Sequence, residues 1–425
     1  MVKITNNSYK DIKSHYDDVL NKDRASFKSS NDEPTPISCV EEMIKKIPKS
    51  FWDRPLENMK ILDPVCGNGN FHSVIYNKLI KKNFSPKNIL ENILYFNDID
   101  NNRTTMIDSI YEANKYNINV TTQDYLEYNE SQQFDLIVAN PPYAKLLPNG
   151  KRASKNHNLI KPFLEKSLKL LKPNGYLLFL TPDNWMSYAD RNKLIQRITS
   201  LQIMYLNIHT AKKYFKKVGS SFTWYLIKNT PGKRKFIVEG IRKGINYKSK
   251  VKSEVRKYIP LVYNDIIQSI LHKTIDSDLP KFKIETSSDL HKYTKKHLIS
   301  TEQDDEHPYR LIHTPKQTVY ASRPHKYQEG YKVFISTTSY YSVGVDECGM
   351  TQSIAFIRCD DIIKAHNIRD VLKHPLYKFL NDICRWGNFN NIRILQSFPI
   401  CDNIDLVWHK FNINENEKDF VLNFI

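Results

Sequence analysis

Long apolar runs are absent from this sequence, although its 425 residues include 20 Phe and 25 Tyr. Because a membrane-spanning helix needs about 20 consecutive apolar residues, we expect none here. The N-terminus has no apolar core of the kind that marks a signal peptide. The six cysteines form no Cys-x-x-Cys pair, so we expect reduced thiols and no zinc or other metal site. The sequence therefore predicts a globular intracellular protein.

Glycine is scarce as well, with 12 residues in the chain. Two of them, Gly67 and Gly69, lie in a loop between an apolar stretch and a predicted helix, in the sequence Asp63-Pro-Val-Cys-Gly-Asn-Gly-Asn-Phe71. No Gly-Lys-Ser/Thr follows, and the third glycine of a dinucleotide fingerprint is missing, so a phosphate-binding loop is not indicated. Asp63 adds an acceptor, which suits a ligand carrying an ammonium group. A tight structural turn is the alternative.

Positive charge is in excess, with 63 Lys and Arg against 46 Asp and Glu and a formal net charge of +17. A surface of this sign attracts polyanions and favours nucleic acid as a partner. A generally lysine-rich proteome is the alternative explanation. The length predicts two or three domains.

Strands and helices alternate over roughly residues 35–230, which predicts a doubly wound, mostly parallel α/β sheet. Thr35-Pro36 offers an N-cap and a first-turn proline for the first helix. Near residues 203–208 and 221–227 two strands follow one another without room for a helical crossover, so this pair should be antiparallel. The alternation ends at Thr230-Pro231-Gly232. We therefore expect an N-terminal extension (1–34), an α/β domain (35–230) and an α+β second domain (231–425).

Acidic residues follow three of the predicted strands: Asp63, Asp98 and Asp124. An acidic side chain after the second strand typically binds ribose hydroxyls, and one after the third could accept from an adenine amino group. Asp98 could instead be an ordinary helix cap, a role that Asp100 would serve equally, and Asp124 a solvated turn carboxylate. Together, however, the three acids predict a ligand site at one edge of the sheet.

The buried stretch 134–139 ends abruptly in Asn140-Pro141-Pro142-Tyr143. Proline restricts the backbone here, so the Asn140 side-chain oxygen and the Pro141 carbonyl can be held beside an aromatic ring. An exocyclic amine lying flat against a ring needs this arrangement. A proline-terminated strand with a packed tyrosine is the alternative.

In this order, the Thr-Pro pair, the glycine loop, Asp98, Asp124 and the tetrapeptide resemble the motifs of S-adenosylmethionine-dependent N6-adenine DNA methyltransferases of the γ class. The resemblance is detailed over about residues 30–230. It implies a seven-stranded Rossmann-like sheet followed by a DNA-recognition domain. The tetrapeptide also occurs in glutamine and ribosomal RNA methyltransferases.

The resemblance also implies roles for individual residues. S-adenosylmethionine would be bound by Thr35, Asp63, Cys66, Gly67, Gly69, Asp98, Ile99, Asp124 and Tyr125. The target amine and base would meet Asn140, Pro141, Tyr143 and a second aromatic, Phe215. Phe222 is a substitute for Phe215, although its place in an apolar run favours a strand-core role.

The implied function is site-specific methylation of adenine N6 in double-stranded DNA, with the base flipped out of the helix. The enzyme would protect host DNA as a cytoplasmic, nucleoid-associated monomer. A cognate restriction endonuclease would act on the same site without forming a stable complex with it. An RNA adenine methyltransferase and a non-catalytic DNA-specificity subunit on the same fold remain the alternatives. The basic stretch Lys233–Lys257, at the start of the second domain, is predicted to contact DNA phosphates, or else to be a solvated lysine-rich face.

Overall fold

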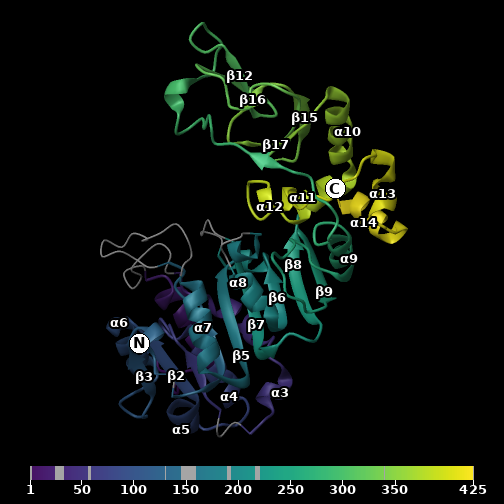
Figure 1. Cartoon of the computed structure of the whole chain (residues 1–425). Helices are drawn as coiled ribbons and strands as arrows, with labels where there is room; N and C mark the ends of the chain where they lie inside the picture. The colour runs from purple at the N-terminus through teal and green to yellow at the C-terminus, as the bar shows by residue number, and fades with distance from the viewer. Residues whose placement is uncertain are drawn as a thin grey trace. The chain divides into compact units, whose positions relative to one another are not determined.

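The computed structural model describes residues 2–23, 33–55, 59–129, 131–144, 159–188, 193–215, 221–338 and 340–424. The chain divides into two compact units (Figure 1): unit 1 is Met1–Asp183 with Lys193–Arg256, and unit 2 is Asn184–Asn192 with Lys257–Ile425. The division falls later than the predicted boundary at Thr230. Of the helices that the structure describes, none has the length and apolar character needed to cross a membrane.

Within the described residues, unit 1 contains one sheet with the strand order β3-β2-β1-β4-β5-β7-β6-β8-β9. Its strands are β1 (Ile61–Asp63), β2 (Leu94–Asp98), β3 (Asn119–Thr122), β4 (Phe134–Ala139), β5 (Leu171–Pro182), β6 (Leu201–Ile208), β7 (Phe222–Pro231), β8 (Phe236–Arg242) and β9 (Ile245–Val251). The strands β3, β2, β1, β4 and β5 pair in parallel. β7 is antiparallel to β5 and β6, as predicted for the last pair.

The helices of unit 1 cover both faces of this sheet. They are α1 (Tyr9–His15), α2 (Ile37–Ile44), α3 (Lys49–Trp52), α4 (Asn70–Ile80), α5 (Pro86–Asn88), α6 (Asn101–Ile110), α7 (Ile160–Leu170) and α8 (Leu194–Ser200). Residues of α2, α4 and α6 share one core cluster with Ile61, Leu136 and Val138. The alternate residues Leu62 and Ile137 point to the opposite face and are equally buried. The predicted doubly wound α/β fold is confirmed.

Strands β8 and β9 extend the sheet beyond the seven strands predicted. β8 pairs in parallel with β6, and β9 forms a hairpin with β8. Gly240 lies opposite Tyr247 in this hairpin, and a Cβ at Gly240 would come within 2.3 Å of the tyrosine ring. Only glycine therefore allows Tyr247 to lie across the hairpin. Much of the basic stretch predicted to open the second domain thus belongs to the sheet of unit 1.

The N-terminal segment, predicted as an extension, is part of the unit 1 core. α1 continues into a π-helical turn at Tyr16–Leu20, and Ile12, Tyr16 and Leu20 are buried in the same cluster as the sheet. The Tyr16 hydroxyl donates to the Asn68 carbonyl at 2.8 Å, inside the glycine loop. The segment therefore supports that loop directly.

Unit 2 contains two small sheets, with the orders β10-β17-β14-β15 and β11-β13-β12-β16 in the described residues. Their strands are β10 (Glu285–Thr286), β11 (Ile299–Ser300), β12 (Tyr309–Thr314), β13 (Gln317–Ala321), β14 (Lys332–Ser336), β15 (Val343–Asp346), β16 (Gly349–Met350) and β17 (Ile354–Arg358). Phe334, Met350 and Phe356 form a core shared by the two sheets. The helices are α9 (Asp265–Lys273), α10 (Ile362–Lys373), α11 (Pro375–Ile383), α12 (Ile392–Leu395), α13 (Val407–Lys410) and α14 (Glu415–Phe424). This α+β composition agrees with the expectation for the second domain.

Asp135 allows a test of how the sheet is held at its amino edge. Its carboxylate accepts from the Lys60 backbone at 3.0 Å and from Lys172 at 2.7 Å, and the residue is 8% exposed. We predict that Asp135→Ala lowers the unfolding free energy by about 1–3 kcal/mol, because the Lys60 N–H and the Lys172 ammonium lose their acceptor. Urea denaturation measures the loss. Asp53→Ala is the control: because Asp53 forms its ion pair with Lys82 at the surface, this variant should lose much less stability. Equal denaturation midpoints for the two variants would contradict the prediction.

Candidate functional site

The sheet brings the predicted acidic residues to one edge. β1, β2, β3 and β4 are parallel and adjacent, so their carboxyl ends lie together. Asp63 ends β1, Asp98 ends β2, Asp124 follows β3 and Asn140 follows β4. This is the edge at which open α/β sheets bind ligands.

The glycine loop between β1 and α4 is shaped by two left-handed residues. Gly67 has φ +53° and Gly69 has φ +84°, a region that side chains other than glycine adopt with strain. A Cβ at Gly69 would also come within 2.9 Å of Ile107 and of the Tyr111 ring. At Gly67, among the residues that the structure describes and apart from its own chain neighbours, no heavy atom lies within 4 Å of that position, so the backbone there faces open space. A ligand can therefore approach the loop closely at Gly67.

Asp98 is tied to this loop. One carboxylate oxygen accepts from the Gly67 backbone at 2.9 Å, and the other accepts from the Asp100 backbone at 3.0 Å. The Arg103 guanidinium lies 3.7 Å away. The helix cap of α6 is Asp100, whose side chain accepts from the Asn102 backbone at 3.0 Å. The alternative that Asp98 is merely this cap is thus excluded.

Asp63 and Cys66 are buried beside Asp98. Burial raises the pKa of the Asp63 carboxyl well above its usual range, and the neighbouring Asp98 carboxylate raises it further. Burial and the same two acids raise the pKa of the Cys66 thiol, which stays protonated. A cationic group bound here would stabilise the Asp63 carboxylate. Asp63 and Asp98 therefore fit a ligand that carries an ammonium group and hydroxyls, as S-adenosylmethionine does.

The other predicted cofactor residues, Ile99, Asp124 and Tyr125, differ in their exposure and contacts. Ile99 is 67% exposed. Asp124 accepts from the Leu126 backbone at 2.9 Å and so caps the short turn Tyr125–Glu127. Tyr125 differs from its predicted setting: it is 2% exposed, its ring packs on Phe163 of α7 and its hydroxyl pairs with Ser167. Because that side chain faces the core, Ile99 is the better candidate for the adenine ring.

The tetrapeptide holds its polar group next to its ring. The Tyr143 hydroxyl donates to Asn140 Oδ1. Asn140 Nδ2 donates to the Glu33 carbonyl at 3.1 Å and to Thr35 Oγ1 at 3.2 Å. Thr35, predicted near the cofactor, thus contacts Asn140 of the tetrapeptide. Pro141 is buried and Pro142 exposed.

The two aromatic candidates lie next to each other, and Phe222 lies beside Tyr143. The Phe222 ring centroid is 5.9 Å from that of Tyr143, and the Phe215 centroid is 4.7 Å from that of Phe222. Phe215 and Phe222 are 2% and 3% exposed. Phe222, at the start of β7, is in ring contact with Tyr143, and Phe215 packs against Phe222.

Sequence reasoning missed the asparagines that connect the loops. Asn97 Nδ2 donates to the Pro64 carbonyl at 2.9 Å and to the Gln123 carbonyl at 3.1 Å, joining the chain after β1 to the chain after β3. Asn70 Nδ2 donates to the Thr35 carbonyl at 2.8 Å. Their only sequence signal is their place next to motif residues.

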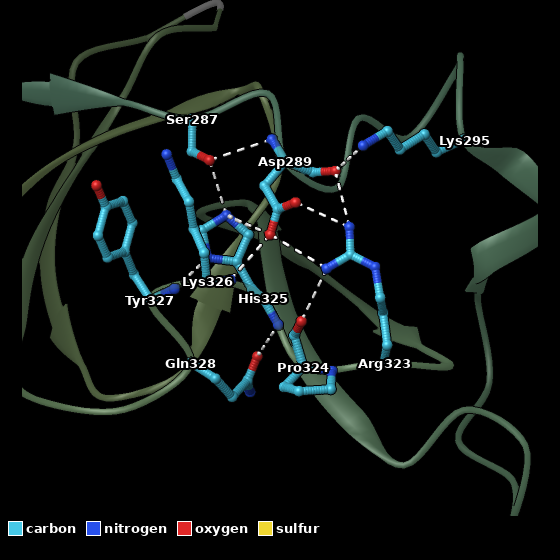
Figure 2. Close-up of polar contacts among 9 residues, drawn as sticks. All are labelled: Ser287, Asp289, Lys295, Arg323, Pro324, His325, Lys326, Tyr327 and Gln328. Carbon is cyan, nitrogen blue, oxygen red and sulfur yellow. Dashed lines mark hydrogen bonds and ion pairs between the residues drawn. The ribbon is translucent and has the colours of Figure 1, made fainter.

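Unit 2 contains a polar cluster with the composition of a nucleophile and its base (Figure 2): Ser287 Oγ is 2.8 Å from His325 Nε2, which is 4.0 Å from Asp289. The Tyr327 backbone donates to His325 Nδ1 at 3.0 Å. The proton of this histidine must then be on Nε2, where it is donated to Ser287. Burial lowers the pKa of His325 to about 4. His325 therefore cannot take the serine proton.

The same cluster is better explained as a structural centre. The Asp289 carboxylate accepts from Arg323 at 2.8 Å and from the Lys326 backbone at 2.8 Å. Arg323 holds the pKa of Asp289 at about 2. These bonds join the chain before β11 to the turn after β13. Elsewhere in the described ranges no group of three His, Cys, Asp or Glu side chains is arranged to hold a metal ion.

Comparison with known proteins points to one family. Residues 24–215 match the family described as Eco57I restriction-modification methylase. Among curated proteins, the Type II methyltransferase M.VspI of Vibrio sp. (strain 343) is 28% identical over 182 residues, covering 38% of this chain and 41% of that protein. M.BstVI of Geobacillus stearothermophilus is 25% identical over 213 residues, covering 41% and 38%. The chain thus spans about two fifths of the length of these relatives.

Solved structures share the fold. The chain in the DrdV–DNA complex aligns with a TM-score of 0.59 and 11% identity, over 92% of this chain and 58% of that one. The Type IIL enzyme MmeI in complex with DNA aligns with a TM-score of 0.51 and 10% identity, over 87% and 65%. The predicted resemblance to restriction–modification DNA methyltransferases is supported over residues 24–215, which are similar to the Eco57I restriction-modification methylase family.

Proposed function

We propose that this protein is a site-specific DNA adenine-N6 methyltransferase of the γ class that acts in a restriction–modification system. The observation that carries the proposal is Asn140 at the carboxyl end of β4, with Tyr143 and Phe222 beside it and the acidic residues on the same sheet edge. An amide oxygen, a neighbouring carbonyl and an aromatic ring together suit a planar exocyclic amine.

On the cofactor side, S-adenosylmethionine supplies a methyl group that is already activated on its sulfonium. Asp98 would hold the ribose hydroxyls and Asp63 would lie nearest the ammonium group. Gly67 would let the backbone approach the methionine moiety. Asp124 and Ile99 would meet the adenine ring. The open space at Gly67 and the raised pKa of the Asp63 carboxyl both support this orientation.

On the substrate side, Asn140 Oδ1 and the Pro141 carbonyl would each accept one N–H of the target amine, while Tyr143 stacks on the base. None of these groups is a strong base. The amine needs alignment and an oriented lone pair, so positioning and electrostatics would supply most of the rate. The base must leave the duplex to reach this edge, since a stacked N6 is inaccessible.

Unit 2 would provide the DNA recognition. The solved DrdV and MmeI structures are DNA complexes, and the net charge of +17 suits a polyanion. We further propose that the protein acts on duplex DNA as a monomer and that a cognate endonuclease acts separately.

The function is tested by following tritium from labelled S-adenosylmethionine into plasmid DNA and into total RNA, and then mapping the modified base. Label in N6-methyladenine of DNA at one sequence is expected. Label only in RNA would favour an RNA methyltransferase. Cofactor binding without methyl transfer to DNA or RNA would contradict the proposal that the protein is an enzyme.

We predict that Asn140→Ala and Tyr143→Ala reduce methyl transfer at least a hundredfold, because each removes about 3 kcal/mol of alignment or stacking. Cofactor affinity should stay within about twofold of wild type in calorimetry, since both residues are on the substrate side. Loss of cofactor binding in folded Tyr143→Ala protein would contradict this arrangement.

Asp98 and Asp100 form a matched pair for the cofactor side. Asp98→Ala should weaken cofactor binding by about 1–3 kcal/mol through lost ribose hydrogen bonds. Asp100→Ala removes the cap of α6, so it should cost about 1 kcal/mol of stability and leave affinity unchanged. Calorimetry and thermal melting separate the two effects. Equal dissociation constants for the Asp98 variant and wild type would disprove the assignment.

Substitutions in the turn before β8 test whether the basic stretch contacts DNA phosphates. Lys233, Arg234 and Lys235 are exposed, and the backbone N–H groups of the first two donate to Gln202 at 3.0 and 2.8 Å. Replacing all three with Ala should weaken binding to every duplex and lower the slope of log affinity against log salt by about 0.9 for each lost phosphate contact. Lys364→Ala is the control, because Asp360 already neutralises that lysine at 2.7 Å. An unaltered slope would mean that the three cations face solvent.

A further inference from the structure

The Asn140 carboxamide has hydrogen-bond partners at both ends. Its two N–H groups are used by the Glu33 carbonyl at 3.1 Å and by Thr35 Oγ1 at 3.2 Å. Its oxygen accepts from the Tyr143 hydroxyl. The NH2 end of the carboxamide therefore faces the 33–35 segment, and its oxygen faces Tyr143.

The Glu33 carbonyl decides which end faces which way. A carbonyl can only accept, so it requires the NH2 end of the carboxamide. Rotating the carboxamide by half a turn would set the Asn140 oxygen against the Glu33 oxygen, two acceptors with no hydrogen between them. The Thr35 hydroxyl accepts from the second N–H. Thr35 is 4% exposed, so water cannot easily replace its hydroxyl as the acceptor. Together these two groups fix the direction of Oδ1.

The 33–35 segment is itself held by the glycine loop and the N-terminal helices. The Thr35 carbonyl accepts from Asn70 Nδ2 at 2.8 Å, and Asn70 is the first residue of α4 and is 6% exposed. Asn70 also donates to Asn21 at 2.9 Å. The Ile37 backbone, at the start of α2, donates to Asp17 at 3.2 Å. Two separate stretches of chain, residues 17–21 and the start of α4, thus set the place of the Thr35 hydroxyl.

We propose that Thr35 is a positioning residue for the transfer step: with the Glu33 carbonyl, its hydroxyl holds the Asn140 carboxamide so that the oxygen faces the target amine. The inference rests on the proposed function. It differs from the role that the sequence resemblance gave Thr35, which was a contact with the cofactor. If the carboxamide turned, its NH2 end would meet the N–H groups of the amine, and alignment of the lone pair would be lost.

The test compares Thr35→Val, which keeps the shape of the side chain, with Thr35→Ser, which keeps the hydroxyl. In single-turnover methylation with saturating DNA and cofactor, the Val variant should lose about tenfold to a hundredfold in rate, because one amide N–H is left without an acceptor. The Ser variant should stay within about threefold of wild type. Cofactor dissociation constants from calorimetry should be unchanged in both.

Thr199→Val is the matched control. Thr199 is also 4% exposed, and its hydroxyl donates to the Ile195 carbonyl at 2.8 Å within α8. This variant should lower the melting temperature without changing the transfer rate. If the Thr35→Val protein does not fold, Thr35→Ala replaces it, with Ser again expected to restore activity.

Three results would overturn the inference: a wild-type rate in folded Thr35→Val protein, equal losses in the Val and Ser variants, or a defect that appears only as weaker cofactor binding. The last would return Thr35 to the cofactor. Failure of the wild-type protein to methylate adenine is a separate outcome, because it would overturn the proposed function before any variant is compared.

Discussion

The parallel register of β1 with β2 is the constraint on which the rest of the site depends. Asp63 is paired with Phe96, so Asp98 extends two residues beyond the end of β1. That offset lets Asp98 reach back to the Gly67 backbone at 2.9 Å and fix the loop. Because side chains alternate along a strand, a slip of one residue would turn Asp98 to the other face of the sheet. The loop, the pKa of Asp63 and the approach to Gly67 would all change with it.

Much of this edge could be predicted from sequence, because strands that end in acidic or Asn-Pro-Pro sequences are local patterns. The settings of individual side chains could not. Tyr125 follows Asp124 as a ring-contact residue would, but its partner Ser167 is 42 positions away on α7. The sequence pattern places the β8–β9 hairpin in the second domain, because the alternation of strands and helices ends before it. What places it in unit 1 is its parallel pairing with β6, which no local periodicity reveals. In the same way, the polar N-terminal segment contributes Tyr16 to the core through a bond to the glycine loop.

The site and the polar cluster of unit 2 show that hydrogen-bond direction carries more information than composition. Ser287, His325 and Asp289 have the residue types of a hydrolytic triad, yet a backbone N–H on Nδ1 gives the histidine the wrong tautomer for a base. Asn140 and Thr35 are common polar residues, yet the backbone carbonyl of Glu33 allows only one orientation of the Asn140 carboxamide. In both places a main-chain group that cannot change its role determines what the side chains can do.

The hairpin of β8 and β9 has a consequence for how the protein behaves in a crowded cell. β9 is the edge strand of the sheet, and an unprotected edge is a template for pairing with another chain. Along it Asn246, Lys248 and Lys250 are exposed in alternation, and Lys248 reaches across to Glu239 at 2.9 Å. A strand from a second molecule would have to bury these ammonium groups to continue the sheet. Lysines at such positions disfavour the pairing of a further strand along an edge.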